Sequence, residues 1–260
     1  MSGPTARRRG LAGLVLPVLL LATWEAGADT GLLPDYLIAP SRIVIAFTAM
    51  AISGELWVHV GASLYRAYMG FAIGSALGIV LGLWAGTSRG ASGFFNPLMS
   101  AIYPVPKVAF LPILIIWLGL GDPSKIATIA LSVFFPAFIN AYAGTRAVPN
   151  IYLWAGRAMG ASSLRMFFLV MLPASLPHVL AGVRVGLGLA FVVLFAAELF
   201  GARSGLGYLI GVAEDSRRYD LMYVAIIAIG LFGFLSDRAL IVVRRRLLAG
   251  QTLSKEEVLA

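Results

Sequence analysis

The stretch that decides the fold is Gly70-Phe-Ala-Ile-Gly-Ser-Ala-Leu-Gly-Ile-Val-Leu-Gly-Leu-Trp-Ala-Gly86, which carries no charge and has a glycine at every fourth position. It lies in a longer apolar run, 59–86, and about 20 mostly apolar residues cross a membrane as a helix. Four residues turn a helix by about 400°, so the glycines form a slowly drifting stripe on one face. The stripe consists of Gly70, Gly74, Gly78, Gly82 and Gly86. Small residues let helices approach closely, so we expect a helix-packing surface here; a general excess of membrane glycine is the alternative.

The composition of the whole chain agrees with a membrane protein. Of 260 residues, 60% are hydrophobic and 12% are charged, against about 25% charged in soluble domains. The net charge of +8 comes from basic residues scattered between apolar runs, which argues against nucleic acid as a partner. The absence of cysteine excludes disulfides and thiolate metal sites, and we expect no metal site.

Six apolar runs predict about six transmembrane helices in one all-α integral membrane domain, 1–260. The runs are 10–28, 59–86, 104–120, 125–143, 182–200 and 221–243. The first has an alternative interpretation as a cleavable secretory signal, because Arg7, Arg8 and Arg9 precede it and Ala26-Gly27-Ala28 ends it. Most basic residues of the connections fall on the side of the N-terminus, which predicts that both termini are cytoplasmic.

One external connection, 41–54, predicts a helix that is too short to span. Ser41 is a candidate N-cap, the uncharged run 43–52 follows, and Gly54 ends it. We expect an interfacial helix outside the membrane; a seventh span is the alternative.

The longest cytoplasmic connection, 144–181, also predicts structure. Residues 150–159 form a short helix closed by Gly160, and Ser162 or Ser163 begins a second helix. Pro173 and Pro177 are expected to end that second helix.

Several polar or irregular positions lie within the spans. Pro104 and Pro106 predict broken helical bonding beside Lys107, whose cation would either meet an anionic solute or reach toward lipid headgroups. Asn140 would line a path or bond to a neighbouring helix. Glu198 is a further candidate for the translocation path. The ionisable residues Arg66, Arg184, Glu198 and Asp237 would alternatively form interhelical pairs or interfacial anchors.

The cytoplasmic connection contains a recognisable pattern: Trp154-Ala155-Gly156, three residues, Gly160, nine residues, Val170, one residue, and Leu172-Pro173. It resembles the "EAA" loop of binding-protein-dependent ABC importer permeases. Further stretches resemble the nitrate, sulfonate, taurine and bicarbonate branch of that family, at 103–112, 117–121, 124–126, 197–199 and 204–210. The chain departs from the family pattern where Trp154 replaces the glutamate and Gly156 replaces the second alanine.

The resemblance implies a fold like that of type I ABC importer permeases, in the cell membrane, and a non-catalytic subunit that translocates a small anion. Its loop would be a coupling helix docked on a cytoplasmic ATPase, formed by Trp154, Ala155, Gly156, Arg157, Gly160, Ala161, Leu172 and Pro173. The implied partners are a second permease copy, two ATPase subunits that bind ATP and Mg, an extracytoplasmic solute-binding protein and the lipid bilayer. This chain itself has no glycine-rich phosphate loop and would hold no cofactor.

An ion-coupled secondary transporter is the alternative function. Glu198 or Asp237 would then carry the coupling ion. A membrane-embedded enzyme is disfavoured, because the sequence contains no HExxH motif and no nucleophile elbow.

Overall fold

The computed structural model describes the backbone of residues 4–248 and the side chains of residues 15–248. The described part is helical and contains no strand. Its elements are α1 (Pro4–Asp29), α2 (Pro40–Ser53), α3 (Glu55–Thr87), α4 (Arg89–Ile102), η1 (Lys107–Phe110), α5 (Leu111–Leu118), α6 (Asp122–Arg146), α7 (Asn150–Ala158), α8 (Ser163–Met166), η2 (Phe167–Met171), α9 (Leu172–Leu199), α10 (Leu206–Asp215) and α11 (Tyr219–Leu247). The predicted domain, 1–260, extends beyond this part at both ends.

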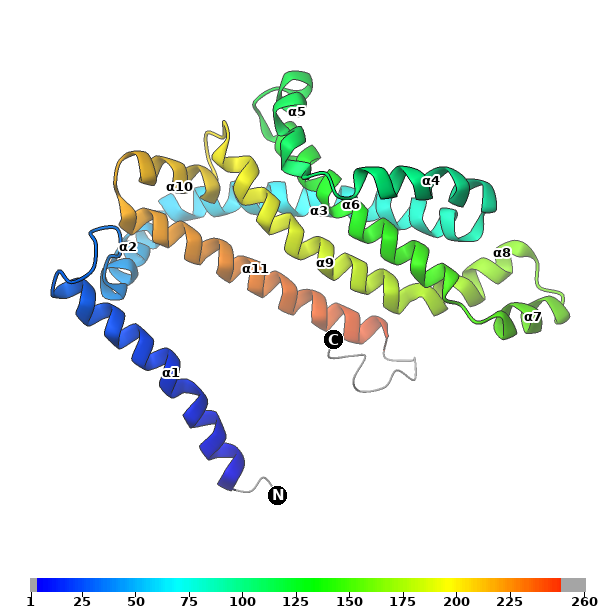
Figure 1. Cartoon of the computed structure of the whole chain (residues 1–260), viewed down its shortest axis with the longest axis horizontal. Coiled ribbons are helices and arrows are strands. Elements are labelled where there is room, and N and C mark those ends of the chain that lie inside the picture. The colour runs from blue at the N-terminus through cyan, green and yellow to red at the C-terminus, as the bar shows by residue number, and fades with distance from the viewer. Residues whose placement is uncertain (1–3, 249–260) are drawn as a thin grey trace.

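Long helices form the body of the molecule. In the described residues, four helical segments are long and apolar enough to cross a membrane: Glu55–Thr87, Asp122–Arg146, Ser163–Leu199 and Tyr219–Leu247. They run along the length of the bundle, with α10 near one end and α7 and α8 at the other (Figure 1). The predicted all-helical membrane fold is therefore confirmed.

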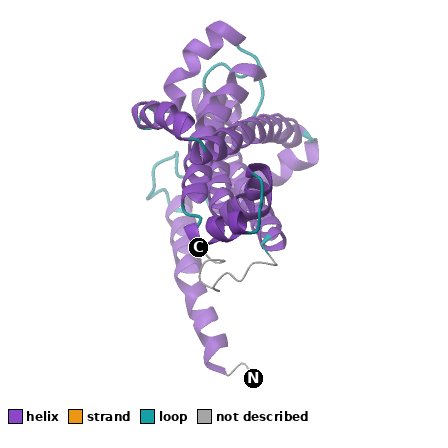
Figure 2. Ribbon diagram, turned by 90° about the vertical axis from the view of Figure 1, so that its right-hand side faces the viewer, coloured by secondary structure: helices purple, strands orange, loops and turns teal. Residues whose placement is uncertain are grey.

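Helix α1 leaves the bundle and points away from it (Figures 1 and 2). It contains the predicted first span, 10–28, and its side chains from Val15 to Leu21 are mostly exposed. That α1 crosses the membrane stays a prediction. The side chains of Arg7, Arg8 and Arg9, on which the secretory-signal alternative depends, lie outside the described residues.

The glycine stripe of α3 lies against α6. A Cβ atom added at Gly70 would be 2.6 Å from Cβ of Ile129, and one added at Gly86 would be 2.6 Å from Cβ of Thr145. Between these ends, Gly74, Gly78 and Gly82 face carbonyl oxygens of the α6 backbone. Dispersion contacts and close backbone approach therefore hold α3 and α6 together, as expected where lipid provides no hydrophobic driving force.

The bounds predicted for the third span, 104–120, are wrong, whereas the interruption of helical bonding predicted at Pro104 and Pro106 is confirmed. The chain instead forms α4, a break, and then η1 with α5, and the two halves are bent by 92°. Pro104 and Pro106 lie in the break, where proline removes N–H donors and restricts the preceding residue. The first half of this bent pair, α4, was not predicted. It begins directly after α3, where Ser88 caps it by accepting from the N–H of Ala91 at 3.3 Å.

The prediction that Pro173 and Pro177 end the second loop helix is also wrong. Helix continues from Ser163 to Leu199 through both prolines. A π-helical turn, Phe167–Met171, lies immediately before Leu172 and Pro173, and such wider turns occur where the regular bonding pattern is interrupted. The connection predicted at 144–181 is thus helical at both ends, and its irregular part lies between Arg146 and Ser163.

Helix α2 begins at Pro40, and Ser41 is not its cap. The capping acceptor is the carboxylate of Glu25 in α1, which receives the backbone N–H of Ser41 at 3.0 Å and its hydroxyl at 2.5 Å. The helix ends at Gly54, whose φ is +86°, as the sequence predicts. Its buried Ile43 joins a cluster with α10 and α11. Helix α10 lies between the apolar runs 182–200 and 221–243 and is too short to span, so it was not predicted.

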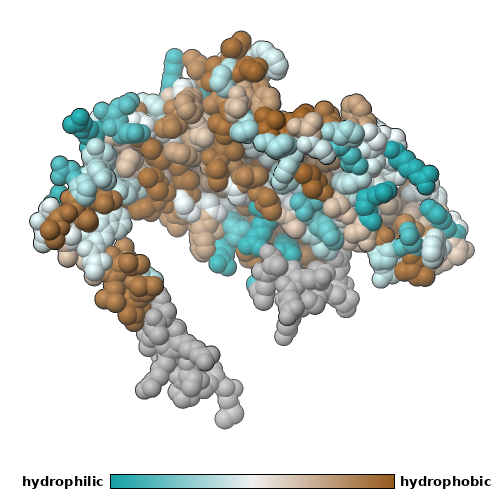
Figure 3. Space-filling model, in the orientation of Figure 1, coloured by the Kyte–Doolittle hydropathy of each residue, from teal (hydrophilic) through white to brown (hydrophobic). Residues whose placement is uncertain are grey.

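Apolar side chains remain exposed over much of the molecule. In Figure 3, brown surface covers α5 and extends over the face formed by α9 and α11. Trp117 in α5 is 75% exposed and Val192 in α9 is 65% exposed. Surfaces of this kind are expected where lipid or another subunit covers a helix.

Candidate functional site

The segment with the loop pattern forms helix α7 and a tight turn. The N–H of Met159 bonds to the carbonyl of Ala155 at 3.0 Å, and the N–H of Ala161 bonds to the carbonyl of Gly156 at 3.0 Å. Gly160 has φ of +78°, a left-handed conformation that favours glycine. The residue that the sequence predicts as the end of the helix therefore closes it.

The turn returns the chain so that α7 packs on the next helix. A Cβ atom added at Gly156 would be 2.6 Å from Cε of Met166, so the flexible end of the Met166 side chain packs directly on this side of α7. Ser162 caps α8 by accepting from the N–H of Arg165 at 3.4 Å. A cavity of about 840 Å³ separates α7 and α8 from the ends of α3 and α6, and Arg157 is one of its lining residues.

Apolar side chains are exposed on several sides of α7, none of whose residues is buried. Trp154 is 61% exposed, and Ile151, Tyr152, Met159 after the helix and Leu164 in α8 are exposed as well. They lie at the end of the bundle away from α10 (Figure 1). By contrast, Leu172 and Pro173 belong to the start of α9, so the pattern divides into a protruding part and a part that anchors the long helix.

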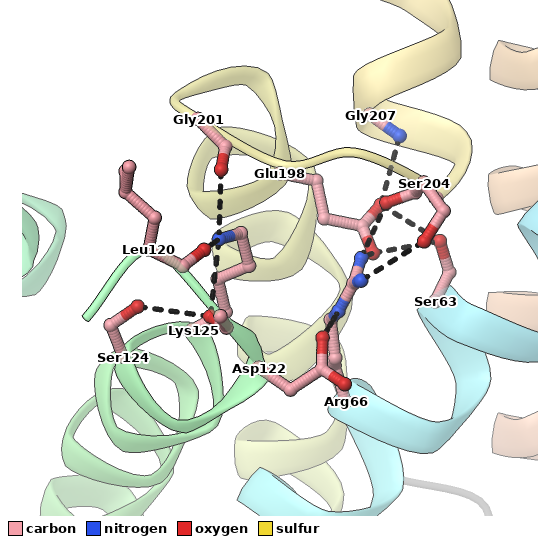
Figure 4. A network of polar contacts seen from close by, with 12 residues as sticks. Ser63, Arg66, Leu120, Asp122, Ser124, Lys125, Glu198, Gly201, Ser204 and Gly207 are labelled. Atoms are coloured by element: carbon pink, nitrogen blue, oxygen red, sulfur yellow. Dashed lines mark hydrogen bonds and ion pairs between the residues drawn. The ribbon is translucent and has the colours of Figure 1, made fainter. Parts of the chain in front are cut away.

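A cluster of charged and polar side chains, the polar centre, surrounds Glu198 at the α10 end of the bundle (Figure 4). Glu198 is completely buried, and its Oε1 lies 2.6 Å from Nη1 of Arg66. Its carboxylate also accepts the hydroxyl of Ser63 at 2.7 Å and the N–H of Gly207 at 2.9 Å. Arg66 in turn places Nε 2.7 Å from Oδ1 of Asp122. The centre joins α3, α6, α9 and α10 at one point.

Arg66, Arg184, Glu198 and Asp237 were expected to lie on a solute path, to form interhelical pairs or to anchor the helices at an interface. The structure shows that all four form interhelical ion pairs. Arg66 and Glu198 pair between α3 and α9, and Arg184 and Asp237 pair between α9 and α11 at 2.9 Å. Glu198 was also predicted to line the translocation path; its carboxylate is fully buried among these partners, and a role in the path stays a prediction.

Lys125 is a further buried cation at the same end. It is 1% exposed, and its Nζ donates to carbonyl oxygens of Leu120 at 2.7 Å, Gly121 at 3.2 Å and Gly201 at 3.3 Å (Figure 4). It thereby links the connection before α6 to the connection after α9. In residues 15–248 it forms no ion pair.

The other predicted path residues do not meet Glu198. Nζ of Lys107 donates to three carbonyls at the end of α4, with Val105 nearest at 2.6 Å, and lies 4.2 Å from the ring centroid of Phe135. Lys107 therefore holds the bend in which the exposed Pro104 and Pro106 lie. Asn140 donates to the carbonyl of Pro136 at 2.9 Å on its own helix.

Four members of the polar centre were not predicted: Ser63, Asp122, Lys125 and Ser204. Ser63 lies within the apolar run 59–86 and Asp122 between two stretches that carry the family resemblance, whereas Lys125 and Ser204 lie inside such stretches. A signal was available in the buried Arg66, which required carboxylate partners from other helices. Among the described residues, no group of three possible metal ligands occurs.

Sequence comparison finds a family model, "Binding-protein-dependent transport system inner membrane component", that matches residues 78–249. The chain is 35% identical over 247 residues to a putative aliphatic sulfonates transport permease protein of Bacillus subtilis, covering 94% of this chain and 90% of the relative. It is 32% identical over 249 residues to the taurine transport system permease protein of Escherichia coli, with the same coverage. A nitrate import permease protein of Synechocystis is 32% identical over 183 residues, covering 70% of this chain and 66% of that protein.

Solved structures support the same fold. An amino acid ABC transporter chain matches with a TM-score of 0.60 at 15% identity, covering 77% of this chain and 98% of that one. A chain of the MetNI methionine ABC transporter in an inward-facing conformation matches with a TM-score of 0.55 at 18% identity, covering 74% and 94%.

Proposed function

Because the chain belongs to the family of binding-protein-dependent transport system inner membrane components, we propose that it is the membrane-spanning subunit of an ATP-driven importer for a small anionic solute. The single observation that carries this proposal is the match along 94% of the chain to permeases named for aliphatic sulfonates and for taurine. The long apolar helices agree with a multi-pass protein of the cell membrane.

The solute class follows from what the relatives' names share. Aliphatic sulfonates, taurine and nitrate are small, and each carries an anionic group whose oxygens accept hydrogen bonds. We infer a solute of this class for the present chain. A separate extracytoplasmic solute-binding protein would deliver it, as the family description implies.

Coupling to ATP hydrolysis would occur through α7. The helix exposes Trp154, and Tyr152 and Met159 are exposed on other sides of it, so it offers protruding apolar side chains to a pocket on another protein. The chain carries no phosphate-binding loop, so ATP and Mg would be held by two cytoplasmic ATPase subunits. One α7 per chain then requires two permease copies, which we propose are identical and rock against each other as rigid bundles.

The alternative of an ion-coupled transporter has less support. Both carboxylates that it would use, Glu198 and Asp237, are paired with arginines. A proton or metal cation would have to displace an arginine from its partner at either position.

Co-purification tests the proposal. The tagged chain is extracted from its native cells in mild detergent, the partners are identified by mass spectrometry, and the ATPase activity of the eluate is measured. Trp154→Asp should reduce the recovered ATPase about tenfold or more, because a charge replaces the proposed aromatic anchor at a docking surface.

Leu32→Asp is the matched control, since Leu32 is also apolar and is 82% exposed, but lies in the connection between α1 and α2. It should leave ATPase recovery unchanged. Recovery of the wild-type chain without any ATPase, even after crosslinking in the membrane, would overturn the proposed function. Equal recovery with Trp154→Asp and wild type would overturn the role of α7.

A further inference from the structure

A small polar cavity lies beside the Glu198 centre, at the α10 end of the bundle. Its volume is about 460 Å³, within the range of small-molecule sites. It is lined by Arg66, Leu120, Gly121, Asp122, Lys125, Ala202, Arg203 and Ser204. The residues come from α3, from α6 with the connection before it, and from the connection between α9 and α10.

The charges around this cavity do not cancel. Arg66, Lys125 and Arg203 lie in its wall, and Asp122 is the carboxylate among the lining residues. Glu198 contacts Arg66 and is the second carboxylate of the centre. Three cations thus face two carboxylates, which leaves one positive charge in excess. Within the described part of the chain, neither Lys125 nor Arg203 forms an ion pair.

The cations have different roles. Arg66 and Lys125 are buried and use their N–H groups on protein oxygens, so they supply fixed positive charge. Arg203 is exposed at the cavity, and its planar guanidinium matches the geometry of an oxyanion. Ser204 Oγ accepts from Nη2 of Arg66 at 3.3 Å, which leaves its own hydrogen to donate into the cavity.

We propose that this cavity binds one small monovalent oxyanion, of the nitrate or alkanesulfonate type, with Arg203 and Ser204 as direct donors. Lys125 and Arg66 attract the anion by their charge, because a cavity with an excess of one sign concentrates counter-ions. The inference deepens the proposed function: the site would receive the solute at the end of the bundle opposite α7 before it enters the membrane path.

The absence of cysteine allows a direct test. Ala202→Cys places a single thiol in the cavity wall of the full chain, held in lipid nanodiscs with any partners that co-purify. The thiol is modified with an anionic reagent, 2-sulfonatoethyl methanethiosulfonate, and with its trimethylammonium counterpart. The ratio of the two rates should favour the anionic reagent by about tenfold, as electrostatic focusing predicts.

Competition identifies a binding site rather than a general surface potential. Nitrate or methanesulfonate, at constant ionic strength set with bulky gluconate, should slow modification of Cys at 202 along a saturating curve. Arg203→Gln in the same background should weaken this protection about tenfold, the effect of losing about 1.4 kcal/mol. The exposure of Arg203 makes this variant compatible with folding.

Ser216→Cys is the matched control, because Ser216 is exposed beside Arg217 and Arg218 but does not line the cavity. It should prefer the anionic reagent without saturable protection. Protection that is equal at both positions, or absent at 202, would overturn the site, and so would faster modification of Cys at 202 by the cationic reagent. Since labelling requires no ATPase, failure of the site and failure of the proposed function give different results.

Discussion

Arg66 shows what a single charged residue requires inside this bundle. A charge near the centre of a membrane helix costs about 2.5–3.5 kcal/mol on insertion scales, and Arg66 is only 4% exposed. The cost is offset because Nε and Nη1 each contact a carboxylate, from Asp122 and Glu198 respectively. The buried charge therefore links α3 to α6 and to α9.

Neutralising one partner should expose this dependence. Glu198→Gln keeps the shape of the side chain but removes one charge from a fully buried pair. We expect a loss of about 3 kcal/mol in the free energy of unfolding, because the buried Arg66 would keep only the half-exposed Asp122 as an ionic partner. Thermal or denaturant unfolding in detergent measures the effect.

Asp237→Asn is the comparison, since the Arg184–Asp237 pair is 33% and 35% exposed. Its loss should cost less than the loss at Glu198, because the remaining charge of a partly exposed pair is less completely desolvated. Equal losses for the two variants would contradict the assignment of Glu198 as the centre of the network.

Residue patterns predict burial of charge better than they predict its partners. The sequence places Arg66 and Glu198 within apolar runs and therefore requires both to be paired or solvated. It does not show which distant segments supply the partners, because Asp122 and Ser204 lie 56 and 138 residues from Arg66 along the chain. Only the packing of α3 against α6 and α9 brings them together.

The contact between α3 and α6 requires residues without a Cβ atom on the facing side of α3. Gly74 faces the carbonyl oxygen of Ala130, and an added Cβ would also lie 2.9 Å from Cβ of Val133. Backbone atoms cannot move aside as a flexible side chain does, so the two helices would have to separate.

Gly74→Ala should therefore destabilise the bundle. We expect a loss of about 1–3 kcal/mol, the usual cost of overpacking a close interface, measured as a lower melting temperature in detergent. Gly61→Ala is the matched control on the same helix, because an added Cβ there meets nothing within 4 Å. It should be neutral or slightly stabilising, since alanine favours helix by about 1 kcal/mol over glycine. A Gly74 variant as stable as the Gly61 variant would show that the stripe does not require glycine.

The elements were predictable to the extent that they depend on local apolar length. The spans near 59–86, 125–143 and 221–243 coincide with α3, α6 and α11, each of which is longer in the structure by a few residues. The bend at Pro104 and the helix through Pro173 differ, although both involve proline. Tertiary packing decides whether a proline ends a helix or is accommodated by a π turn, and the residue itself does not specify which.

The exposed apolar helices indicate that lipid or other subunits cover much of the surface of this chain. Only 11% of the most apolar window of α11 is buried within the chain, against 50% for α6. Helices α1 and α5 project from the bundle with exposed apolar side chains (Figure 1). Lipid covers part of this surface, and the proposed second copy would cover another part.

Native mass spectrometry from nanodiscs tests the assembly. Each chain contributes 27.6 kDa, so the permease part of the proposed importer should weigh twice that value, with two ATPase subunits attached. Collisional release of one ATPase subunit should leave both permease copies together. A stable assembly with one copy of this chain and a different permease chain would replace the homodimer with a heterodimer.

Helix α6 connects the two ends of the molecule without interruption. One end leads through Arg146 to α7, and the other carries Asp122 and Lys125 in the cavity wall. Its 25 residues correspond to about 37 Å, and Pro136 would ordinarily allow it to flex in the middle. The glycine stripe holds α3 against the α6 backbone on both sides of this proline, with Gly74 at Ala130 and Gly82 at Phe138, so α3 restrains α6 from bending. A displacement of α7 would then move α6 as one rigid helix and reach the anion cavity at its other end.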